Sequence, residues 1–251
     1  MKYTLLEMVQ DILNDLDSDE VNSINDTVES QQVAQIIKTS FYEQIANRNW
    51  PHLRKLIQLE SLGDVTKPNY LKIPKGMKEL ISLRYDVHDV DQLSYRMNEL
   101  KYKEPEAFLR NGYGRTINSP DIIQVRDFSG SILHIRNDRA PNYWTSFDDK
   151  HIVTDSYDAG VDDTLQKSKT QCMAYIEPKW VHMDSAIPDL PDEAFPGLLE
   201  EAKSTAFLVL KQMANQKAEQ KAARQSRWLS RKAWTVKGGI QYENYGRKGR
   251  R

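Results

Sequence analysis

The sequence of residues 26–51 is DTVESQQVAQIIKTSFYEQIANRNWP, and the chain changes its hydrophobic period at the end of this stretch. Apolar residues recur at helical spacing from Val33 to Ile45, which predicts a helix with one buried face. Pro51 disfavours helical geometry at Trp50, so the helix should end there. Beyond this point the period becomes two, and the pattern favours strands.

Helical patterns also occupy the two ends of the chain. Thr4 and Glu7 form a capping-box pattern in front of the first apolar helical face. A closing helix is entered near Pro196, where a missing N–H costs little. Its core-facing stripe consists of Leu198, Leu199, Ala202, Ala206, Val209, Leu210 and Met213. Because helix propensity stays high through Arg227, we expect this helix to continue and to leave the core as a basic extension.

The middle of the chain alternates between apolar and polar residues. Ile81 and Leu83 should face the same side of a strand whose other face is wet. A hairpin over residues 123–135 is expected around the turn at Ser129-Gly130. The pattern also predicts a helix over 105–110, a second hairpin over 143–157 and a strand over 172–176.

These patterns predict an α+β chain, in which a helical bundle built from both ends carries an inserted β-rich domain and a basic C-terminal helix and arm. The expected segments are the bundle helices of residues 1–50, the β-rich domain 51–191, the closing helix 192–216, and the basic helical extension with a flexible arm, 217–251.

Charge is distributed unevenly along the 251 residues. Residues 217–251 contain eleven basic and two acidic residues, a balance of +9, whereas the preceding segment carries −10. Such asymmetry is typical of a tail that meets a polyanion or an acidic protein surface, and also of a solvated arm. A single cysteine, Cys172, excludes an intramolecular disulfide and favours a reducing compartment. No signal peptide or membrane span is expected, since the longest apolar run is Ala206–Leu210.

Catalytic patterns are missing from the sequence. The five histidines are scattered and form no H-E-x-x-H motif. Residues 155–166 resemble a calcium loop only at Gly160, because apolar or unsuitable side chains occupy ligand positions. Neither a Walker loop nor a G-x-S-x-G elbow occurs. We therefore expect no catalytic residues, no cofactor and no metal site, and we predict that the chain is not an enzyme.

Two tryptophans in the basic segment are distinctive. Trp228 and Trp234 interleave with Arg227, Arg231 and Lys232, a pattern typical of a nucleic-acid contact or of an anchor in another protein's groove. The protein anchor is favoured, because an amphipathic helix bearing tryptophans offers buried area and no base-reading pattern is present.

The order of these elements resembles the head-to-tail adaptor, or tail tubular protein A, of short-tailed bacteriophages. The segments that carry the resemblance are Leu5–Leu13, Asp19–Ile24, the helix that ends in Asn47-Arg48-Asn49-Trp50, Tyr143–Asp149 and Phe195–Ser204.

The resemblance implies a structural protein of the virion neck, assembled in the host cytoplasm. It would form a ring of twelve copies beneath the portal protein, pass double-stranded DNA through its channel without sequence-specific binding, and receive the tail nozzle below. An acidic channel lining would repel DNA and let it slide. No membrane partner is implied. The proposed portal-docking residues are Lys217, Lys221, Arg224, Arg227, Trp228, Arg231, Lys232, Trp234, Arg247, Lys248, Arg250 and Arg251.

A second interpretation stays open on the sequence alone. The cations of residues 217–251 could bind phosphates without sequence preference, which would make the chain a non-enzymatic nucleic-acid-binding accessory protein.

Overall fold

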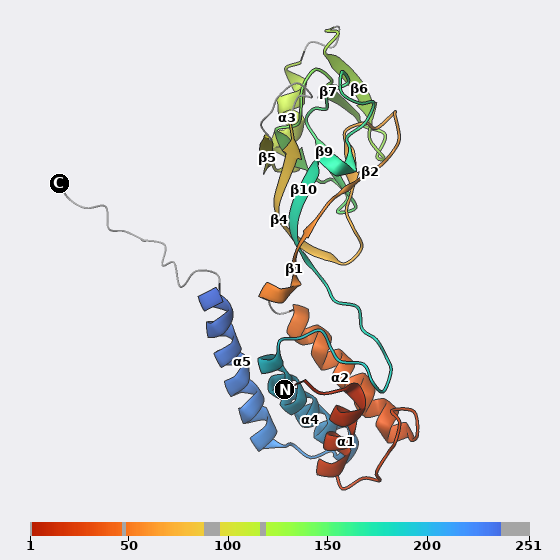
Figure 1. The fold of residues 1–251 in the computed structure, drawn as a ribbon, viewed down its shortest axis with the longest axis vertical. Helices are drawn as coiled ribbons and strands as arrows, with labels where there is room; N and C mark the ends of the chain where they lie inside the picture. Colours follow the sequence, from red (N-terminus) through yellow and green to blue (C-terminus); the bar gives the residue numbers. More distant parts are fainter. Residues whose placement is uncertain (1, 47–48, 88–95, 116–118, 237–251) are drawn as a thin grey trace, which may run out of the picture. The chain divides into compact units, whose positions relative to one another are not determined.

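The computed structural model describes residues 2–46, 49–87, 96–115 and 119–236, with the side chains of 231–236 excepted. The chain contains both helices and sheets, so the predicted α+β class is confirmed (Figure 1). It divides into two compact units. Unit 1 comprises Met1–Leu53 together with Pro178–Arg251, and unit 2 comprises Arg54–Glu177.

Unit 1 is helical. Its elements are α1 (Leu5–Asp15), α2 (Val28–Ala46), the 3-10 turns η1 (Pro51–Leu53) and η3 (Asp192–Ala194), α4 (Phe195–Lys211) and α5 (Gln216–Val236). Helices α1 and α2 contact each other, and both contact α4. The apolar faces meet in a core that includes Leu5, Ile12, Ile37, Phe41 and Phe195, each at most 1% exposed. Burial of these faces stabilises helices that would be marginal alone.

Capping residues fix where the first two helices begin. The predicted capping box is confirmed: the Glu7 N–H donates to Thr4 Oγ1 at 3.2 Å, and the Thr4 N–H donates to Glu7 Oε2 at 2.7 Å. Helix α2 begins after Thr27, whose hydroxyl accepts the Ser30 N–H at 3.0 Å while Ser30 Oγ accepts the Thr27 N–H at 3.1 Å. Both ends satisfy backbone donors that have no partner within the helix.

Residues 178–191, which the sequence pattern assigned to the β-rich segment, lie within unit 1. The Leu5 N–H donates to the Ala186 carbonyl at 2.8 Å. The Asp184 carboxylate accepts the Ile24 N–H at 2.9 Å. These bonds tie the segment to α1 and to the connector between α1 and α2, which explains why it groups with the helices.

Unit 2 is built on a mixed sheet. Its elements are β1 (Arg54–Ile57), β2 (Glu60–Ser61), β3 (Tyr70–Lys72), β4 (Met77–Asp86), β5 (Met97–Tyr102), α3 (Pro105–Tyr113), β6 (Ile122–Arg126), β7 (Ile132–Arg136), β8 (Tyr143–Thr145), β9 (His151–Thr154), η2 (Lys167–Lys169) and β10 (Thr170–Ile176). Among the described residues, eight strands follow the order β1-β10-β4-β5-β8-β9-β3-β2, and β6 pairs with β7. Among the pairs of strands described, β5–β8 is parallel and the others are antiparallel.

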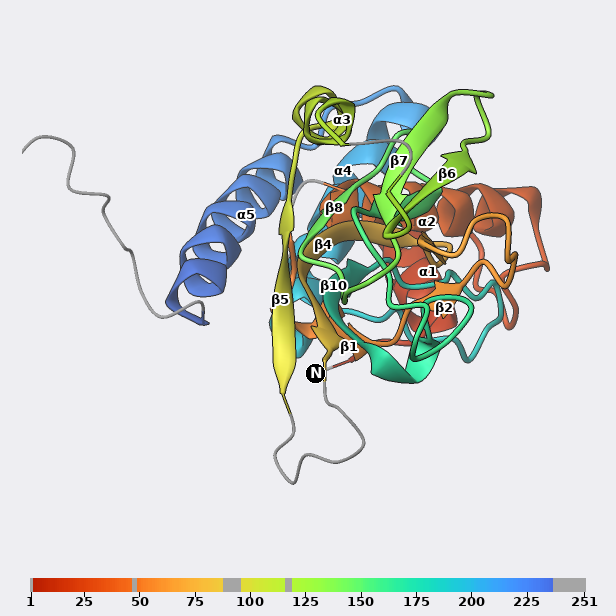
Figure 2. The same ribbon diagram turned by 90° about the horizontal axis from the view of Figure 1, so that it is seen from above.

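Both predicted hairpins are confirmed. In the first, Ile123 lies opposite Ile135 and Val125 opposite Leu133, and Gly130 adopts φ 88° in its turn, a conformation that glycine accepts at little cost. In the second, β8 and β9 pair antiparallel. The predicted helix over 105–110 is also present as α3, which lies beside β7 (Figures 1 and 2).

A β-bulge corrects the prediction for Ile81. The register between β4 and β10 shifts so that Ser82 lies opposite Met173 and Leu80 opposite Ala174, which leaves Ile81 without a partner position. Beyond a bulge the side-chain alternation changes face. Leu83 is 1% exposed in the core as predicted, but Ile81 is 39% exposed.

Candidate functional site

The helix that bears the predicted docking residues begins after a reversal of the chain. Helix α4 ends at Lys211 because Gln212 adopts a left-handed backbone with φ 53°. Asn215 then starts α5, with its side-chain Oδ1 accepting the Ala218 N–H at 3.1 Å. The predicted continuous helix through Arg227 is therefore wrong. Residues with high helix propensity lie on both sides of the turn, but propensity leaves out the contacts that α5 makes with α4 after the reversal.

The same reversal corrects the predicted core stripe of α4. Leu198, Ala202 and Ala206 are fully buried, whereas Val209 and Met213 are 58% and 66% exposed. The buried face ends at Ala206 because the helix stops one turn later. In the last turn of α4, Leu208 and Val209 are exposed to solvent and Leu210 is partly buried.

Helix α5 packs along α4 instead of leaving the core, contrary to the prediction. Lys221 Nζ lies 2.7 Å from Glu200 Oε1, and Gln225 Nε2 donates to the Glu193 carbonyl at 2.8 Å. Among the side chains of α5 that the structure describes, those of Ala218 and Leu229 are buried, at 3% and 5% exposure. The face of α5 that packs on α4 consists of residues 218, 222, 225 and 229. These positions recur at helical spacing, a signal that the sequence prediction did not use.

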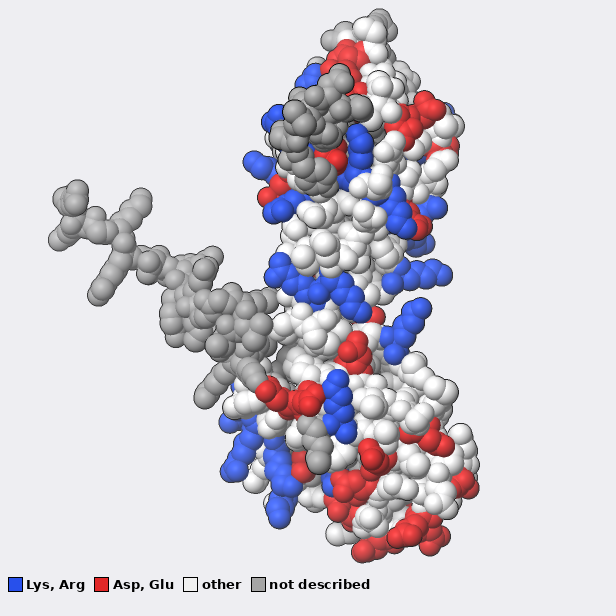
Figure 3. All heavy atoms as spheres, in the orientation of Figure 1, with Lys and Arg blue, Asp and Glu red and all other residues white. Residues whose placement is uncertain are grey.

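The part of α5 that flanks the docked face is basic and exposed. Lys217, Lys221, Arg224 and Arg227 are exposed, and Trp228 beside them is 47% exposed. Figure 3 shows the Lys and Arg side chains gathered along α5. The α1 side of unit 1 is different, because between Lys2 and Lys38 the sequence has eight acidic residues and no basic one. Unit 1 therefore carries a basic edge and an acidic edge.

The structure brings part of the predicted docking set together. Lys217, Lys221, Arg224, Arg227 and Trp228 share one helix, as described above. The backbone of α5 includes Arg231, Lys232 and Trp234, but the structure does not describe their side chains. Arg247, Lys248, Arg250 and Arg251 lie outside the described residues altogether.

A groove of about 400 Å³ runs between α5 and the helices α2 and α4. Small side chains line it, because α5 presents Ala222 and Ala223 here and α4 presents Gly197. Gln44 reaches it from α2, donating through Nε2 to Glu201 Oε2 at 3.2 Å, while the buried Gln44 Oε1 has no hydrogen-bond partner. Helix α5 thus packs on α4 and leaves this groove open between them. The sequence did not predict the groove.

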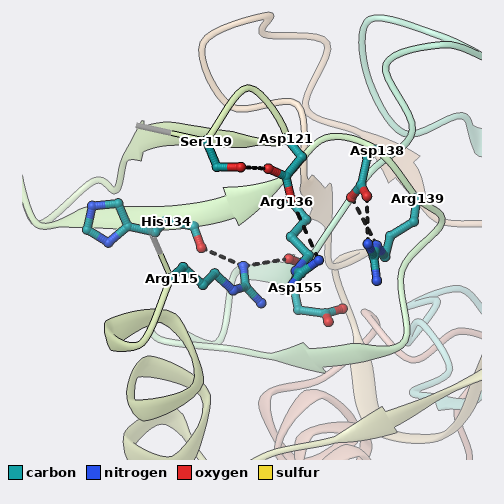
Figure 4. Close-up of polar contacts among 8 residues, drawn as sticks. All are labelled: Arg115, Ser119, Asp121, His134, Arg136, Asp138, Arg139 and Asp155. Atoms are coloured by element: carbon teal, nitrogen blue, oxygen red, sulfur yellow. Dashed lines mark hydrogen bonds and ion pairs between the residues drawn. The ribbon is translucent and has the colours of Figure 1, made fainter. Parts of the chain in front are cut away.

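Unit 2 contains a separate polar cluster (Figure 4). The half-buried Arg115, just after α3, donates through Nη1 to the carbonyl of His134 on β7 at 2.6 Å and to that of Asp155 after β9 at 3.2 Å. Arg136 Nη1 lies 3.7 Å from Asp121 Oδ2, and Asp121 also accepts a hydrogen bond from Ser119. The cluster ties α3 to two strands.

Electrostatics in this cluster favour ionised groups. Burial lowers the pKa of Arg115, although an arginine stays charged at neutral pH. The hydrogen bond from Ser119 lowers the pKa of Asp121, and the bond from Arg139 lowers that of Asp138. Carboxylates held in this way act as acceptors and structural ties, since they have no proton to donate near neutral pH.

The remaining chemistry of the described residues is sparse. In this part of the chain no three His, Cys, Asp or Glu side chains form a group able to hold a metal ion. Cys172 is fully buried, and burial raises the pKa of its thiol to about 11, which makes it a poor nucleophile. None of the helices in the described ranges combines the length and hydropathy needed to span a bilayer.

Comparison with known proteins adds no family. No family model matches the chain, and no curated protein matches it in sequence. The basic face of α5 is therefore the candidate site that rests on the chain's own geometry.

Proposed function

We propose that the chain is a structural adaptor of a short-tailed bacteriophage, located in the virion neck. In this proposal unit 1 is the helical bundle and unit 2 the β-rich domain inserted in it. Twelve copies form a ring beneath the portal protein, double-stranded DNA passes through the ring, and the tail nozzle binds below.

The observation that carries this proposal is the two-faced character of α5. One face is held on α4 by Ala218, Leu229 and the Lys221–Glu200 ion pair. The other presents Lys217, Arg224, Arg227 and the indole of Trp228. A helix held on a bundle loses little conformational freedom on binding, and arginine with tryptophan is the side-chain combination that dominates protein interfaces. The complementary portal surface is acidic, with an apolar recess for the indole.

The direct test is electron-microscope class averages of the protein mixed with the portal encoded nearest to it, beside the protein alone. The adaptor proposal requires an added ring at one end of the portal. A portal that stays bare while both proteins are folded would contradict it.

Charge reversal locates the docking surface. The triple variant Lys217→Glu, Arg224→Glu, Arg227→Glu should fail to bind the portal, because its face would repel an acidic partner. A matched control reverses Lys75, Lys101 and Lys150, three exposed lysines of unit 2, and should bind as the parent does. If both triple variants bind equally well, α5 is not the docking element.

The second candidate, a sequence-independent nucleic-acid-binding protein, is favoured by the same exposed cations. Binding through phosphates falls steeply with salt, with a logarithmic slope of about −0.9 per phosphate neutralised. Titration of duplex DNA at several salt concentrations separates the two functions. Tight, salt-sensitive binding by a protein that ignores the portal would favour the second candidate.

A further inference from the structure

We propose that α5 exchanges between copies: the α5 helix of one chain docks in the groove on α4 of a second chain, and α4 and α5 of each chain then form one continuous helix. The proposal takes its biological setting from the ring proposed above, but it concerns the protein alone. The contact that is exchanged is the α4–α5 contact already described.

The hinge between the two helices has the sequence Gln212-Met213-Ala214-Asn215, without glycine or proline. Glutamine, methionine and alanine are strong helix formers. Gln212 is nevertheless held at φ 53°, a left-handed conformation that is unfavourable for residues other than glycine. A short hinge under strain favours exchange of the element that follows it. Continuing the helix through Gln212 removes the strain and adds helical hydrogen bonds.

The described contacts that hold α5 on α4 can form equally well on α4 of a second copy. They include two buried side chains, Ala218 and Leu229, one ion pair to Glu200, and the bond from Gln225 to the Glu193 carbonyl. The groove beside them keeps an open volume of about 400 Å³ and an unpartnered Gln44 Oε1. Docking on a second copy restores the contacts that undocking breaks, so the conformation of the hinge decides the balance between the two forms.

Apolar exposure on α4 supports the same arrangement. Leu208, Val209 and Met213 are 61%, 58% and 66% exposed around the hinge. In a continuous helix these residues and the docking face of α5 lie on one rod, about 60 Å long at 1.5 Å per residue. Such a rod reaches a neighbouring copy while Lys217, Arg224 and Arg227 stay exposed, because these three take no part in the docking contacts described.

The geometry offers a direct way to detect the exchange. A Cβ placed on Gly197 would lie 3.6 Å from Gln225 Cβ, within the separation that disulfides require. The double variant Gly197→Cys, Gln225→Cys should close a disulfide within one chain in the hairpin form. Mixing the two single variants, each on its own chain, can form that disulfide only when α5 of one copy lies on α4 of another.

The experiment mixes the single variants Gly197→Cys and Gln225→Cys at high protein concentration, oxidises them, and measures the disulfide-linked heterodimer by non-reducing electrophoresis and peptide mass. Parent protein carrying only the buried Cys172 is the background control. We expect the heterodimer to form. Its absence, while the double variant closes its disulfide within one chain, would overturn the proposal. Absence of the disulfide from both samples would overturn it as well, since α5 would then occupy neither groove.

Two hinge variants shift the exchange in opposite directions without touching the docked surface. Gln212→Gly relieves the left-handed residue in the hairpin and should lower the heterodimer fraction about tenfold. Asn215→Ala removes the cap on the Ala218 N–H and should raise it about fivefold. Shifts of equal sign would contradict the hinge mechanism. Because no portal is present, failure here leaves the portal test of the adaptor function unaffected.

Discussion

Lys203 of α4 connects two acidic residues of α1. Its Nζ lies 2.7 Å from a carboxylate oxygen of Asp11 and of Asp15, and its side chain is only 11% exposed. Burial disfavours the charged ammonium group, but the hydrogen bonds to the two carboxylates outweigh this and raise the pKa of Lys203. A raised lysine pKa contributes stability that is present in full below the unfolded-state pKa of about 10.4 and is lost as pH rises through the folded-state pKa.

Lys203→Met should lower the free energy of unfolding by about 1–2 kcal/mol at pH 7, since it leaves two aspartates facing each other with no cation between them. Urea unfolding followed by circular dichroism measures this difference at pH 7 and at a series of alkaline pH values. The gap between parent and variant should shrink as the pH rises through the folded-state pKa of Lys203, because the parent's ammonium group then loses its proton. A gap that stays constant with pH would show that packing of the lysine stem, and not its charge, is responsible.

Gly197 sets how closely α5 approaches α4. A Cβ at this position would lie 3.0 Å from Gln225 Cγ, tighter than ordinary van der Waals contact. The branched side chain of Gly197→Val crowds the Gln225 side chain and should push α5 outward, at a cost of about 1–3 kcal/mol.

Hydrogen exchange of the α5 amides measures this displacement. Protection in α5 should fall in the Gly197→Val variant while protection in α1 and α2 is kept. Gly114→Ala is the matched control, because nothing lies within 4 Å of a Cβ added there. Unchanged α5 protection in the valine variant would mean that Gly197 does not fix the helix spacing.

The sequence predicts elements well where one local signal is strong, and fails where a distant contact decides. The Thr4–Glu7 cap and the turn at Gly130 are encoded within a few residues, and both are found in the structure. The bulge at Ile81 depends on the register of β10, far away in sequence. The reversal at Gln212 depends on the surface of α4 that receives α5. The same holds for the candidate site. Its basic residues could be predicted from the sequence, but the groove beside α5 and the ion pair with Glu200 could not, because both depend on how α5 packs on α4.

The two units have separate hydrophobic cores. The cluster around Leu83, Leu100 and Cys172 consists of residues of unit 2 only, whereas the helices of unit 1 close their own core. Units built in this way often unfold as distinct cooperative parts, so one free energy does not describe the whole chain.

Leu83→Ala tests this independence. Leu83 is 1% exposed, and its truncation should cost unit 2 about 2–4 kcal/mol. Native-state hydrogen exchange should then become faster in β4, β5 and β10 and stay as in the parent in α1, α2 and α4. Equal acceleration in both units would show that the chain unfolds as a single cooperative structure.

The two charged edges of unit 1 give it a permanent electric dipole. Its negative end lies on the acidic side of α1, and its positive end lies on α5. The electric field of an acidic surface orients such a molecule before contact, so that α5 faces the surface. A larger fraction of encounters then leads to binding. Added salt shortens the range of that torque to a few ångströms. The charge distribution of unit 1 thus determines its orientation during approach as well as its affinity after contact.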